Sequence, residues 1–313
     1  MISCVPEFAH KSVLLAEVLE ALRPRGGEKW VDGTVGGGGH AAAILQASAP
    51  DGWLFGMDRD DAALDAAGKR LAEFAGRFEL RRGNFSELGS WVQPSSCGGV
   101  LLDLGVSSPQ LDRAERGFSF QTEGPLDMRM DRSQPLTAAD LLNRESEYEL
   151  ARIMWEYGDE RQSRRFAKAI VERRKAKPFE TTKQLAEFIE RLAPRHGKKT
   201  HPATQVFQAL RIAVNDELGS LERGLEASVK VLKPGGRLAV ITFHSLEDRL
   251  VKRFGNERTR DYTFEGEVDV PELRKPRVPE LRWVQRKAIQ PSAEEVRENA
   301  RARSAQLRVL EKI

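Results

Sequence analysis

The chain has 313 residues, of which 40% are hydrophobic and 31% are charged, and its formal net charge is +3. This apolar content suits one large core and a second, smaller one, so we expect two domains. No stretch approaches the roughly 20 apolar residues that cross a bilayer, and the opening MISCVPEFAHKS lacks a secretory signal's basic-then-apolar order, so we expect a cytoplasmic protein without membrane contact.

Short apolar runs alternate with helical patterns, which indicates βαβ units and a parallel sheet. Five strands are expected, at Lys29–Asp32, Trp53–Asp58, Phe78–Arg82, 100–104 and 237–243. Ligands of an open parallel sheet bind beyond the carboxyl ends of its strands, so the chemistry should lie there.

The first strand leads into the strongest local signal, DGTVGGGGH at residues 32–40. Glycines let the backbone approach a ligand closely, and Asp58, ending the second strand, is placed to accept hydrogen bonds from ribose hydroxyls. This arrangement is typical of a nucleoside-cofactor site. It does not identify the cofactor, because Gly36, Gly38 and Ala41 also satisfy the dinucleotide fingerprint. A glycine-rich turn without a ligand is the alternative.

More than a hundred residues separate the fourth and fifth strands, far more than a crossover needs. Helical periodicity predicts helices around 150–157 and 185–192, the second capped by Thr181 and Gln184 and ended by Pro194. A longer helix follows Pro202 and stops at KPGG, residues 233–236. We expect a sheet domain of residues 1–112 and 213–313, interrupted by an inserted helical domain, 113–212, for substrate recognition.

The chain beyond the fifth strand continues with a polar stretch, 256–280, that contains three prolines and predicts an irregular loop. Two final strands are expected at 281–289 and 305–310. We find no internal repeat.

The cysteines and histidines are too scattered to suggest a disulfide framework or a metal site. Cys4 and Cys97 are far apart, and the closest histidines, His196 and His201, have no cysteine or carboxylate at ligand spacing. We therefore expect no metal.

Basic residues gather in three runs. The first holds Arg161, Arg164, Arg165, Lys168, Arg173, Arg174, Lys175 and Lys177; the second Arg195, Lys198 and Lys199; the third Arg274, Lys275, Arg277, Arg282, Arg286 and Lys287. Such runs suit nucleic-acid phosphates, because each neutralised phosphate releases counterions. Charge runs are more often solvated faces, so these alone do not establish RNA binding, nor which run contacts RNA.

Three features favour S-adenosylmethionine over a nicotinamide cofactor. Phe85 follows the third strand, where its ring can cover one face of an adenine. The fourth strand ends in Asp103, which a polar turn follows. LKPGG at 232–236 precedes a strand that closes in FHS at 243–245, with two more strands beyond. This order resembles class I methyltransferases, although Thr34 stands where their first glycine is common.

At these residues the resemblance becomes specific, because the chain resembles the ribosomal RNA small subunit methyltransferase H family, also called MraW, over nearly its whole length. The matching segments are residues 10–15, 32–40, 101–111, 115–120, 124–131, 201–215, 243–254 and 299–304. The resemblance implies an α/β class I, Rossmann-like methyltransferase sheet, mostly parallel with an antiparallel C-terminal strand, plus the inserted helical domain.

The resemblance also implies N4-methylation of a cytidine in the decoding region of 16S ribosomal RNA, within a small subunit that is assembled or nearly so. It implies S-adenosylmethionine contacts at Gly38, Gly39, His40, Asp58, Phe85, Asp103 and Gln110. Each of these positions is filled as the family pattern requires. The sequence does not give the oligomeric state, and a homodimer stays open.

An exocyclic cytosine amine is a poor nucleophile, because its lone pair is delocalised into the ring. The enzyme must therefore hold it in line with the sulfonium methyl, and positioning of this kind can supply roughly 7 to 11 kcal/mol. Asp103 and the carbonyls of Ser107 and Ser108 stand where acceptors for the amine protons are needed. The alternative, that Asp103 is a cofactor ligand only, is slightly favoured, and the two roles are not exclusive.

His244 is the second catalytic candidate, because it ends a strand at the ligand-binding edge and could take the proton that the amine loses. The alternative, that it holds the turn at 245–248, is slightly favoured. Phe118 and Phe120 could stack on a flipped cytosine or pack within the inserted domain. Asn215, polar on an apolar helix face, is a further candidate.

Two other classes of protein stay open. An NAD-dependent oxidoreductase would share the glycine turn and Asp58, but the sequence offers no convincing hydride-transfer site. A non-catalytic ribosome assembly factor could use the basic faces and keep the cofactor pocket as a relic. The intact cofactor positions argue against that second class.

Overall fold

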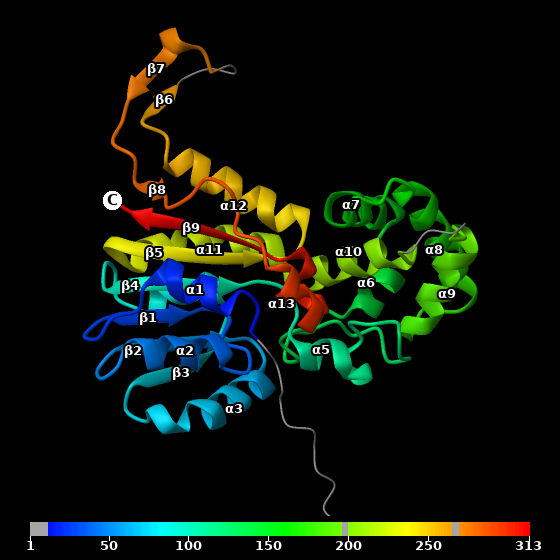
Figure 1. Ribbon diagram of the computed structural model, residues 1–313. Helices are drawn as coiled ribbons and strands as arrows, with labels where there is room; N and C mark the ends of the chain where they lie inside the picture. The colour runs from blue at the N-terminus through cyan, green and yellow to red at the C-terminus, as the bar shows by residue number, and fades with distance from the viewer. Residues whose placement is uncertain (1–11, 196–199, 265–268) are drawn as a thin grey trace, which may run out of the picture. The chain divides into compact units, whose positions relative to one another are not determined.

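Figure 1 shows the computed structural model, in which residues 12–195, 200–264 and 269–313 are described. The chain divides into two compact units, Met1–Gly105 with Gly219–Ile313, and Val106–Leu218. The second unit is thus a few residues longer at each end than the expected 113–212. Cys4, His196, Lys198 and Lys199 lie outside the described residues, as do residues 10 and 11 of the first matching segment.

A seven-stranded sheet organises the first unit, in the order β3-β2-β1-β4-β5-β9-β8. Its strands are β1 (Lys29–Asp32), β2 (Trp53–Asp58), β3 (Phe78–Arg82), β4 (Cys97–Asp103), β5 (Leu232–Thr242), β8 (Leu281–Trp283) and β9 (Gln306–Lys312). Strands β1 to β5 pair in parallel, whereas β9 runs antiparallel to both of its neighbours. The expected class I sheet, mostly parallel with an antiparallel C-terminal strand, is confirmed.

The first three strands have the expected bounds, whereas the later strands differ. Helix α11 (Glu217–Val231) ends next to the expected stop, but β5 begins at Leu232, so the KPGG segment lies inside this strand. The strand accommodates it because the register with β4 shifts near Cys97 and because Gly235 adopts a φ of +76°. β8 ends early, at Trp283, and Ile289 contributes only an isolated bridge to Leu307.

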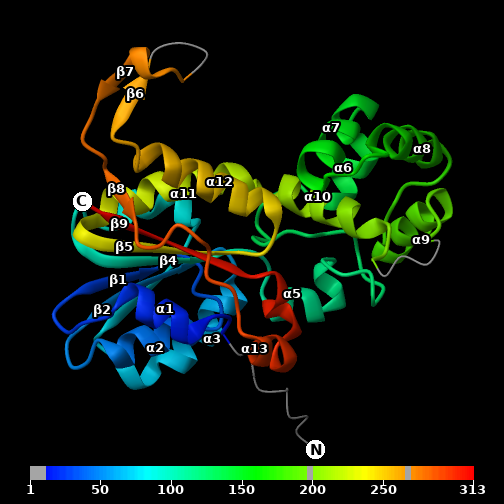
Figure 2. The same cartoon turned by 45° about the horizontal axis from the view of Figure 1, so that its top comes forward.

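The expectation of an irregular loop over 256–280 is wrong for its described part. Helix α12 (Ser245–Arg258) extends into this segment, and β6 (Tyr262–Phe264) pairs antiparallel with β7 (Arg274–Pro276). Figures 1 and 2 show this two-stranded arm projecting beyond α12. Strands of three residues are too short for a period-two pattern to be recognised in sequence.

Alternate strand residues place one apolar face of the sheet against helices α1 (Leu15–Leu22) and α2 (Gly39–Ala47). Trp30 of β1, Leu101 of β4 and Ile241 of β5 belong to this buried cluster, together with Ile44 of α2. The remaining helices of the unit are α3 (Asp61–Arg70), α4 (Leu88–Trp91), most of α11 (Glu217–Val231), α12 and α13 (Ala293–Glu298).

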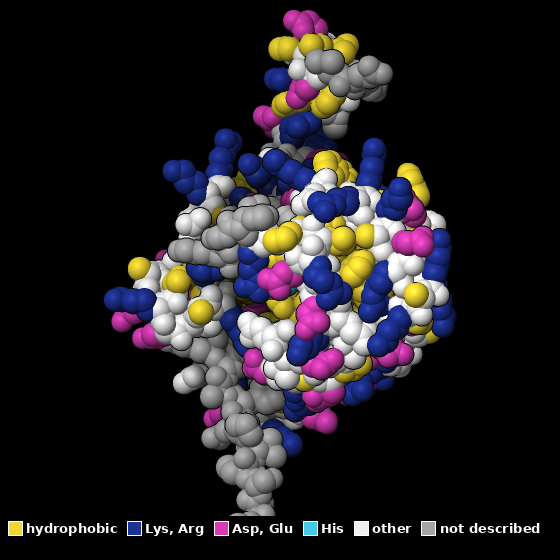
Figure 3. Space-filling model, turned by 90° about the vertical axis from the view of Figure 1, so that its right-hand side faces the viewer, with side chains coloured by type: hydrophobic (Ala, Val, Ile, Leu, Met, Phe, Trp, Pro, Cys, Tyr) yellow, Lys and Arg dark blue, Asp and Glu magenta, His cyan; other side chains and the backbone are white. Residues whose placement is uncertain are grey.

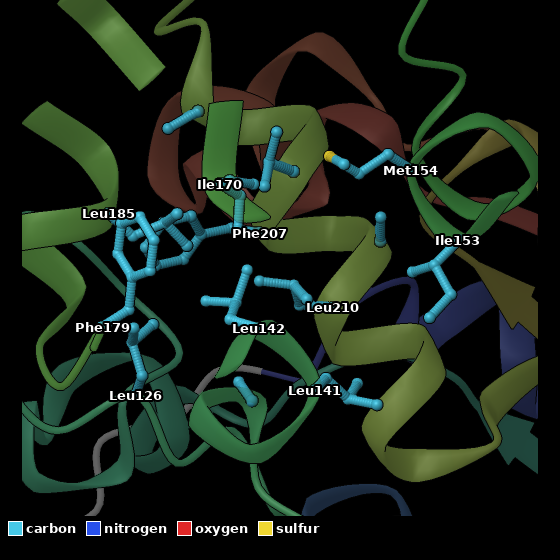
Figure 4. Close-up of a cluster of buried hydrophobic side chains, with 14 of the residues drawn as sticks. Leu126, Leu141, Leu142, Ile153, Met154, Ile170, Phe179, Leu185, Phe207 and Leu210 are labelled. Atoms are coloured by element: carbon cyan, nitrogen blue, oxygen red, sulfur yellow. The ribbon is translucent and has the colours of Figure 1, made fainter. Parts of the chain in front are cut away.

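The second unit is helical and has its own core (Figure 4). Its helices are α5 (Ser108–Asp112), α6 (Ala138–Arg144), α7 (Glu147–Gly158), α8 (Ser163–Ala176), α9 (Thr182–Leu192) and α10 (Ala203–Asn215). The expected helices at 150–157 and 185–192 are confirmed. Thr181 caps α9 by accepting from the Gln184 amide at 3.3 Å, but the Gln184 side chain accepts from the Glu180 amide and not from that of Thr181.

The single long helix expected after Pro202 is two helices, α10 and α11. Asp216 between them has a φ of 47°, a left-handed conformation that ends α10 at Asn215. Among the described residues, every helix is too short or too polar to span a bilayer.

Candidate functional site

Acidic side chains gather at the carboxyl edge of the sheet in the first unit. Asp32 ends β1, Asp58 ends β2 and Asp103 ends β4, while Glu247 lies in the first turn of α12, directly after β5. Because β1 lies between β2 and β4 in the sheet, these strands bring their last residues to one edge. This is the edge where parallel sheets bind ligands.

The glycine-rich loop after β1 is tied to the strands on either side. Thr34 donates its amide to Asp32 Oδ1 at 3.2 Å, and its hydroxyl oxygen accepts from the Asp103 amide at 2.7 Å. Gly36 has a φ of +51° and donates its amide to Asp58 Oδ2 at 2.9 Å. Thr34, which departs from the usual glycine pattern, therefore connects the loop to β4.

Gly38 and Gly39 begin helix α2 and leave little room for side chains. Gly38 caps the helix with a φ of +78°, and a Cβ there would lie 3.1 Å from the Ala67 backbone. A Cβ on Gly39 would lie 2.1 Å from Ser12 Oγ. Both glycines are therefore required by packing within the unit, and approach of a ligand to their backbone stays a prediction.

Asp58 is held by the backbone around it. Its Oδ2 accepts from Gly36 and its Oδ1 accepts from the Asp60 amide, each at 2.9 Å. Burial raises the pKa of Asp58, against the lowering effect of these hydrogen bonds. A carboxylate oxygen can accept more than one hydrogen bond, so contact with ribose hydroxyls stays a prediction.

Buried His40 lies beside half-buried Asp103. His40 Nε2 lies 3.0 Å from the Val13 carbonyl oxygen, and Nδ1 lies 3.6 Å from Asp103 Oδ2. Since a carbonyl only accepts, Nε2 carries a hydrogen, and an unprotonated Nδ1 would face the carboxyl of Asp103. Burial, with the negative charges of Asp32 and Glu247, raises the pKa of Asp103 well above its usual range. A proton between His40 Nδ1 and the Asp103 carboxyl is therefore favoured, in addition to the hydrogen on Nε2.

One carboxyl oxygen of Asp103 is an unsatisfied hydrogen-bond acceptor among the described residues. Its Oδ1 is buried and has no hydrogen-bond partner among the described residues. Buried polar atoms are normally paired, so an orphaned acceptor at the ligand edge points to a donor or a cation that a ligand supplies. This fits the predicted role of Asp103 at the cofactor or at the amine.

Asp32 is a site residue that the sequence did not single out. It is 1% exposed, and burial raises its pKa to about 7, although the hydrogen bond from Thr34 acts to lower it. The negative charge of Asp58 adds to the rise. A carboxyl that titrates near neutrality at a ligand edge can change its charge when a ligand binds.

Phe85, the predicted adenine cover, begins a short 3₁₀ turn after β3, and two glycines fix its ring. A Cβ on Gly33 would lie 3.0 Å from the Phe85 Cβ, and a Cβ on Gly224 of α11 would lie 2.3 Å from its Cδ2. Phe85 therefore occupies space that these positions leave open. Its contact with adenine stays a prediction.

Ser220 of α11 connects the loops that follow β2 and β3. Its hydroxyl oxygen accepts from Arg59 Nη2 at 2.6 Å and from Asn84 Nδ2 at 2.9 Å, and the residue is 1% exposed. Arg59 follows Asp58 and Asn84 precedes Phe85 in the chain. Ser220 therefore holds the chain next to both predicted cofactor residues. It lies one helical turn before Gly224, which contacts the Phe85 ring.

His244 forms the N-cap of α12 and is engaged with Glu247. Its Nδ1 accepts from the Glu247 amide at 3.4 Å, and its Nε2 lies 3.1 Å from Glu247 Oε1. Glu247 Oε2 in turn accepts from the amides of Phe243 at 2.8 Å and of His244 at 3.3 Å. The turn-holding role is thus present, and the catalytic role of His244 stays a prediction.

Ser107, Ser108 and Gln110 belong to the second unit and form the start of α5. Ser107 caps this helix, and its carbonyl accepts from the amides of Gln110 at 3.1 Å and of Leu111 at 3.3 Å. Gln110 Oε1 accepts from the Ser107 amide at 3.0 Å. The local bonds of the Ser107 carbonyl compete with its predicted role as an acceptor for cytosine.

Asn215 and the two phenylalanines have packing roles within the second unit. Asn215 Oδ1 accepts from the Met130 amide at 2.8 Å, and its Nδ2 donates to the carbonyls of Met128 at 2.8 Å and Arg211 at 2.9 Å. Phe118 is buried, and Phe120 packs against Phe207 at 4.8 Å between ring centroids. Asn215 therefore orders a loop, which explains a polar residue on an apolar helix face.

The profile of the MraW methylase family matches residues 7–313. The chain belongs to this family. The ribosomal RNA small subunit methyltransferase H of Geobacter sulfurreducens is 53% identical over 98% of this chain and 99% of its own length. The proteins of the same name from Syntrophotalea carbinolica and Symbiobacterium thermophilum are 52% and 51% identical, each over 98% of this chain and over 98% and 97% of their own lengths.

In this MraW family member, one unit brings together the glycine loop, His40, Asp58, Phe85 and Asp103. No sequence pattern had pointed to Asp32, Ser220, Gly224 or Glu247 as site residues. Asp32 stood in the quoted motif, so its position before the glycines was a usable signal. Ser220 and Gly224 carry no motif, and only the packing of α11 shows what they do.

Proposed function

We propose that this protein uses S-adenosylmethionine to methylate N4 of a cytidine in the decoding region of 16S ribosomal RNA, within the small ribosomal subunit. The names of relatives that are 51% to 53% identical over nearly the whole chain support the small-subunit RNA as substrate. The family resemblance of the sequence supports the cytidine and its N4 position.

The observation that carries the cofactor assignment is the charge of the site. Asp32 is buried and Asp58 and Asp103 are half-buried, all three have raised pKa values, and the neighbouring charges that add to these rises are carboxylates. A sulfonium and an α-ammonium group would offset this concentration of negative charge. The pyrophosphate of a dinucleotide would add to it, which disfavours the oxidoreductase alternative.

The residues present fit the proposed cofactor. The glycine-rich loop would present its backbone to the cofactor, Asp58 would accept from the ribose hydroxyls, and Phe85 would cover the adenine. The orphaned Oδ1 of Asp103 would receive a donor from the cofactor or from the cytosine amine. When bound, S-adenosylmethionine supplies an electrophilic methyl group on sulfur.

The chain's own contribution is to orient the amine and to accept its protons as hydrogen bonds. S-adenosylmethionine, held by the glycine-rich loop, Asp58 and Phe85, would supply the methyl group that N4 of the cytosine would take from sulfur. The nitrogen becomes acidic once it is methylated, so it loses its proton to water or to His244 and needs no strong base. We assign recognition of the RNA around the cytidine to the inserted helical unit.

The proposed substrate also sets where the protein acts. Small ribosomal subunits are assembled in the cytoplasm, so we place the protein there, with 16S ribosomal RNA as its partner and without a metal. A homodimer stays a prediction, which light scattering on the purified protein would test.

The test is transfer of labelled methyl from S-adenosylmethionine to small ribosomal subunits, to free 16S RNA and to DNA, followed by nucleoside analysis. We expect labelled N4-methylcytidine in the subunits and little label in the other two. Cofactor binding without label in any substrate would favour the assembly-factor alternative. Binding of NAD in place of S-adenosylmethionine would favour the oxidoreductase.

A further inference from the structure

A groove of about 620 Å³ lies between α12 and the arm that β6 and β7 form. The α12 wall presents one helical face, spaced i, i+3, i+4 and i+7, made of Arg249, Lys252, Arg253 and Asn256. The arm contributes Tyr262 and Phe264, and Arg260 stands where helix and arm meet. The groove thus combines cationic and aromatic side chains from two elements of the first unit.

Most of the basic side chains in this groove have no acidic partner among the described residues. Arg249 and Lys252 are exposed and form no ion pair with any described residue. Arg253 pairs with Glu222 at 2.6 Å, but the two side chains are 70% and 55% exposed, so this pair contributes little. Glu257 is the single acid among the described residues that line the groove. The groove therefore attracts a polyanion.

The aromatic rings of the arm are stacked against arginines. Arg260 lies over Tyr262 at 5.2 Å and over Phe264 at 5.6 Å from the ring centroids. Arg274 covers Tyr262 at 4.2 Å and also donates to Asp269 at 2.8 Å. Arg260 forms no ion pair among the described residues, so its planar guanidinium is available to stack on a base or to bind a phosphate.

The arm is fixed to the end of α12. Arg277 donates its amide to the Asp261 carbonyl at 2.8 Å, its Nε to the Arg260 carbonyl at 3.0 Å, and its Nη2 to the Glu257 carbonyl. Carbonyls at the end of a helix need such partners, so this arginine builds the groove and is not part of its binding surface.

Helix α12 connects the groove to the candidate site. It starts directly after His244 at the ligand edge and has 14 residues. At 1.5 Å per residue it is roughly 20 Å long, which an RNA strand spans with a few nucleotides. A strand that places its cytidine at the site could therefore place neighbouring nucleotides in the groove.

The basic run of α8 offers a less clear surface. Arg173 donates to the Lys177 carbonyl at 2.8 Å, Arg174 to the Leu142 carbonyl at 2.6 Å, and Lys175 pairs with Glu172. Figure 3 shows basic and acidic side chains interspersed over the face of the molecule in front. The arm groove is therefore the better candidate.

We propose that the groove between α12 and the β6–β7 arm docks a single-stranded segment of small-subunit ribosomal RNA, a few nucleotides from the methylated cytidine. The inference rests on the proposed function, because that function makes this RNA the polyanion. Positive grooves with aromatic and arginine stacking are how proteins follow a single RNA strand. An acidic protein segment would match the charge but offers no base to stack on the guanidinium of Arg260.

The test compares the double variant Arg249→Gln/Lys252→Gln with the control Arg25→Gln/Lys29→Gln. The control removes the same charge from exposed residues around the start of β1, which do not line the groove. Affinity for small subunits and for protein-free 16S RNA is measured over a salt series. For the groove variant we expect roughly tenfold weaker binding to both and a salt slope shallower by roughly 1.5, with unchanged cofactor affinity.

A groove variant that binds as the control does overturns the proposal. So does a loss of affinity for subunits without a loss for protein-free RNA, which would assign the groove to a ribosomal protein. Arg260→Gln adds a test of stacking, because it should weaken binding with a smaller change in slope than the double variant. Wild-type protein that binds subunits through the groove yet methylates nothing would refute the proposed function and leave the docking surface standing.

Discussion

The carboxyl of Asp32 couples the charge of the site to pH. Burial raises its pKa from 3.8 to about 7, so the folded chain binds a proton that the unfolded chain has already lost. This stabilisation is fully present below about pH 4 and is lost as the pH rises towards 7. For the cofactor-free protein we therefore expect a decreasing contribution of Asp32 to the free energy of unfolding across that window.

A cationic cofactor reverses the preference of Asp32, because it favours the ionised carboxylate. Binding of S-adenosylmethionine should release a proton near pH 7, and its affinity should increase by up to about tenfold from pH 6 to pH 8. Titration calorimetry in two buffers of different ionisation enthalpy measures the proton. Asp32→Asn should reduce this release, and an unchanged release in the variant would assign the proton to another group, such as Asp103.

The position of the Phe85 ring depends on Gly224. In Gly224→Ala the new Cβ would lie 2.3 Å from the ring, so the ring must move, and overpacking of this kind costs about 1 to 3 kcal/mol. We expect cofactor affinity to fall about tenfold or more, as measured by calorimetry. In the control, Gly68→Ala on α3, the nearest atom is a Leu80 methyl at 3.8 Å. That variant should gain stability and keep its affinity, and equal losses in both variants would contradict the role of Phe85.

Residues with a left-handed backbone end helices α7 and α10. Asp159 caps the C-terminus of α7 with a φ of 50°, a left-handed conformation that is strained for any residue other than glycine. Asp159→Gly should raise the free energy of unfolding by about 1 kcal/mol, and Asp159→Ala should lower it. Urea denaturation of the three proteins measures both changes. A glycine variant less stable than the alanine variant would show that the aspartate has contacts that outweigh the strain.

The elements that sequence predicts well are those whose pattern is local. β1, β2 and β3 have the expected bounds because apolar runs end at polar or glycine residues, and the Thr181 cap of α9 is a local hydrogen bond. The break between α10 and α11 was missed because the helical pattern continues through Asp216, and only its left-handed backbone reveals the turn. β6 and β7 were missed because their pairing joins segments that are too short to show a period.

Prediction of the candidate site from the sequence has a similar limit. The glycine loop, Asp58 and Asp103 could be predicted because they lie at strand ends in a known order, and the family resemblance named His40, Phe85 and Gln110. The hydrogen bonds of Ser220 and the space left by Gly224 could not, because they depend on how α11 packs against loops far away in the chain. Side chains that hold other side chains leave no motif.

Each unit has a separate core, which predicts independent folding of the inserted one. The buried cluster of the second unit, from Phe118 to Val214, is drawn entirely from its own chain segment. A fragment of residues 106–218 should therefore unfold cooperatively, with helical circular dichroism and a single urea transition. The variant Phe166→Ala, which removes a fully buried ring, should lower its stability by about 3 to 5 kcal/mol. A fragment without a transition would show that the helical core forms only with the rest of the chain.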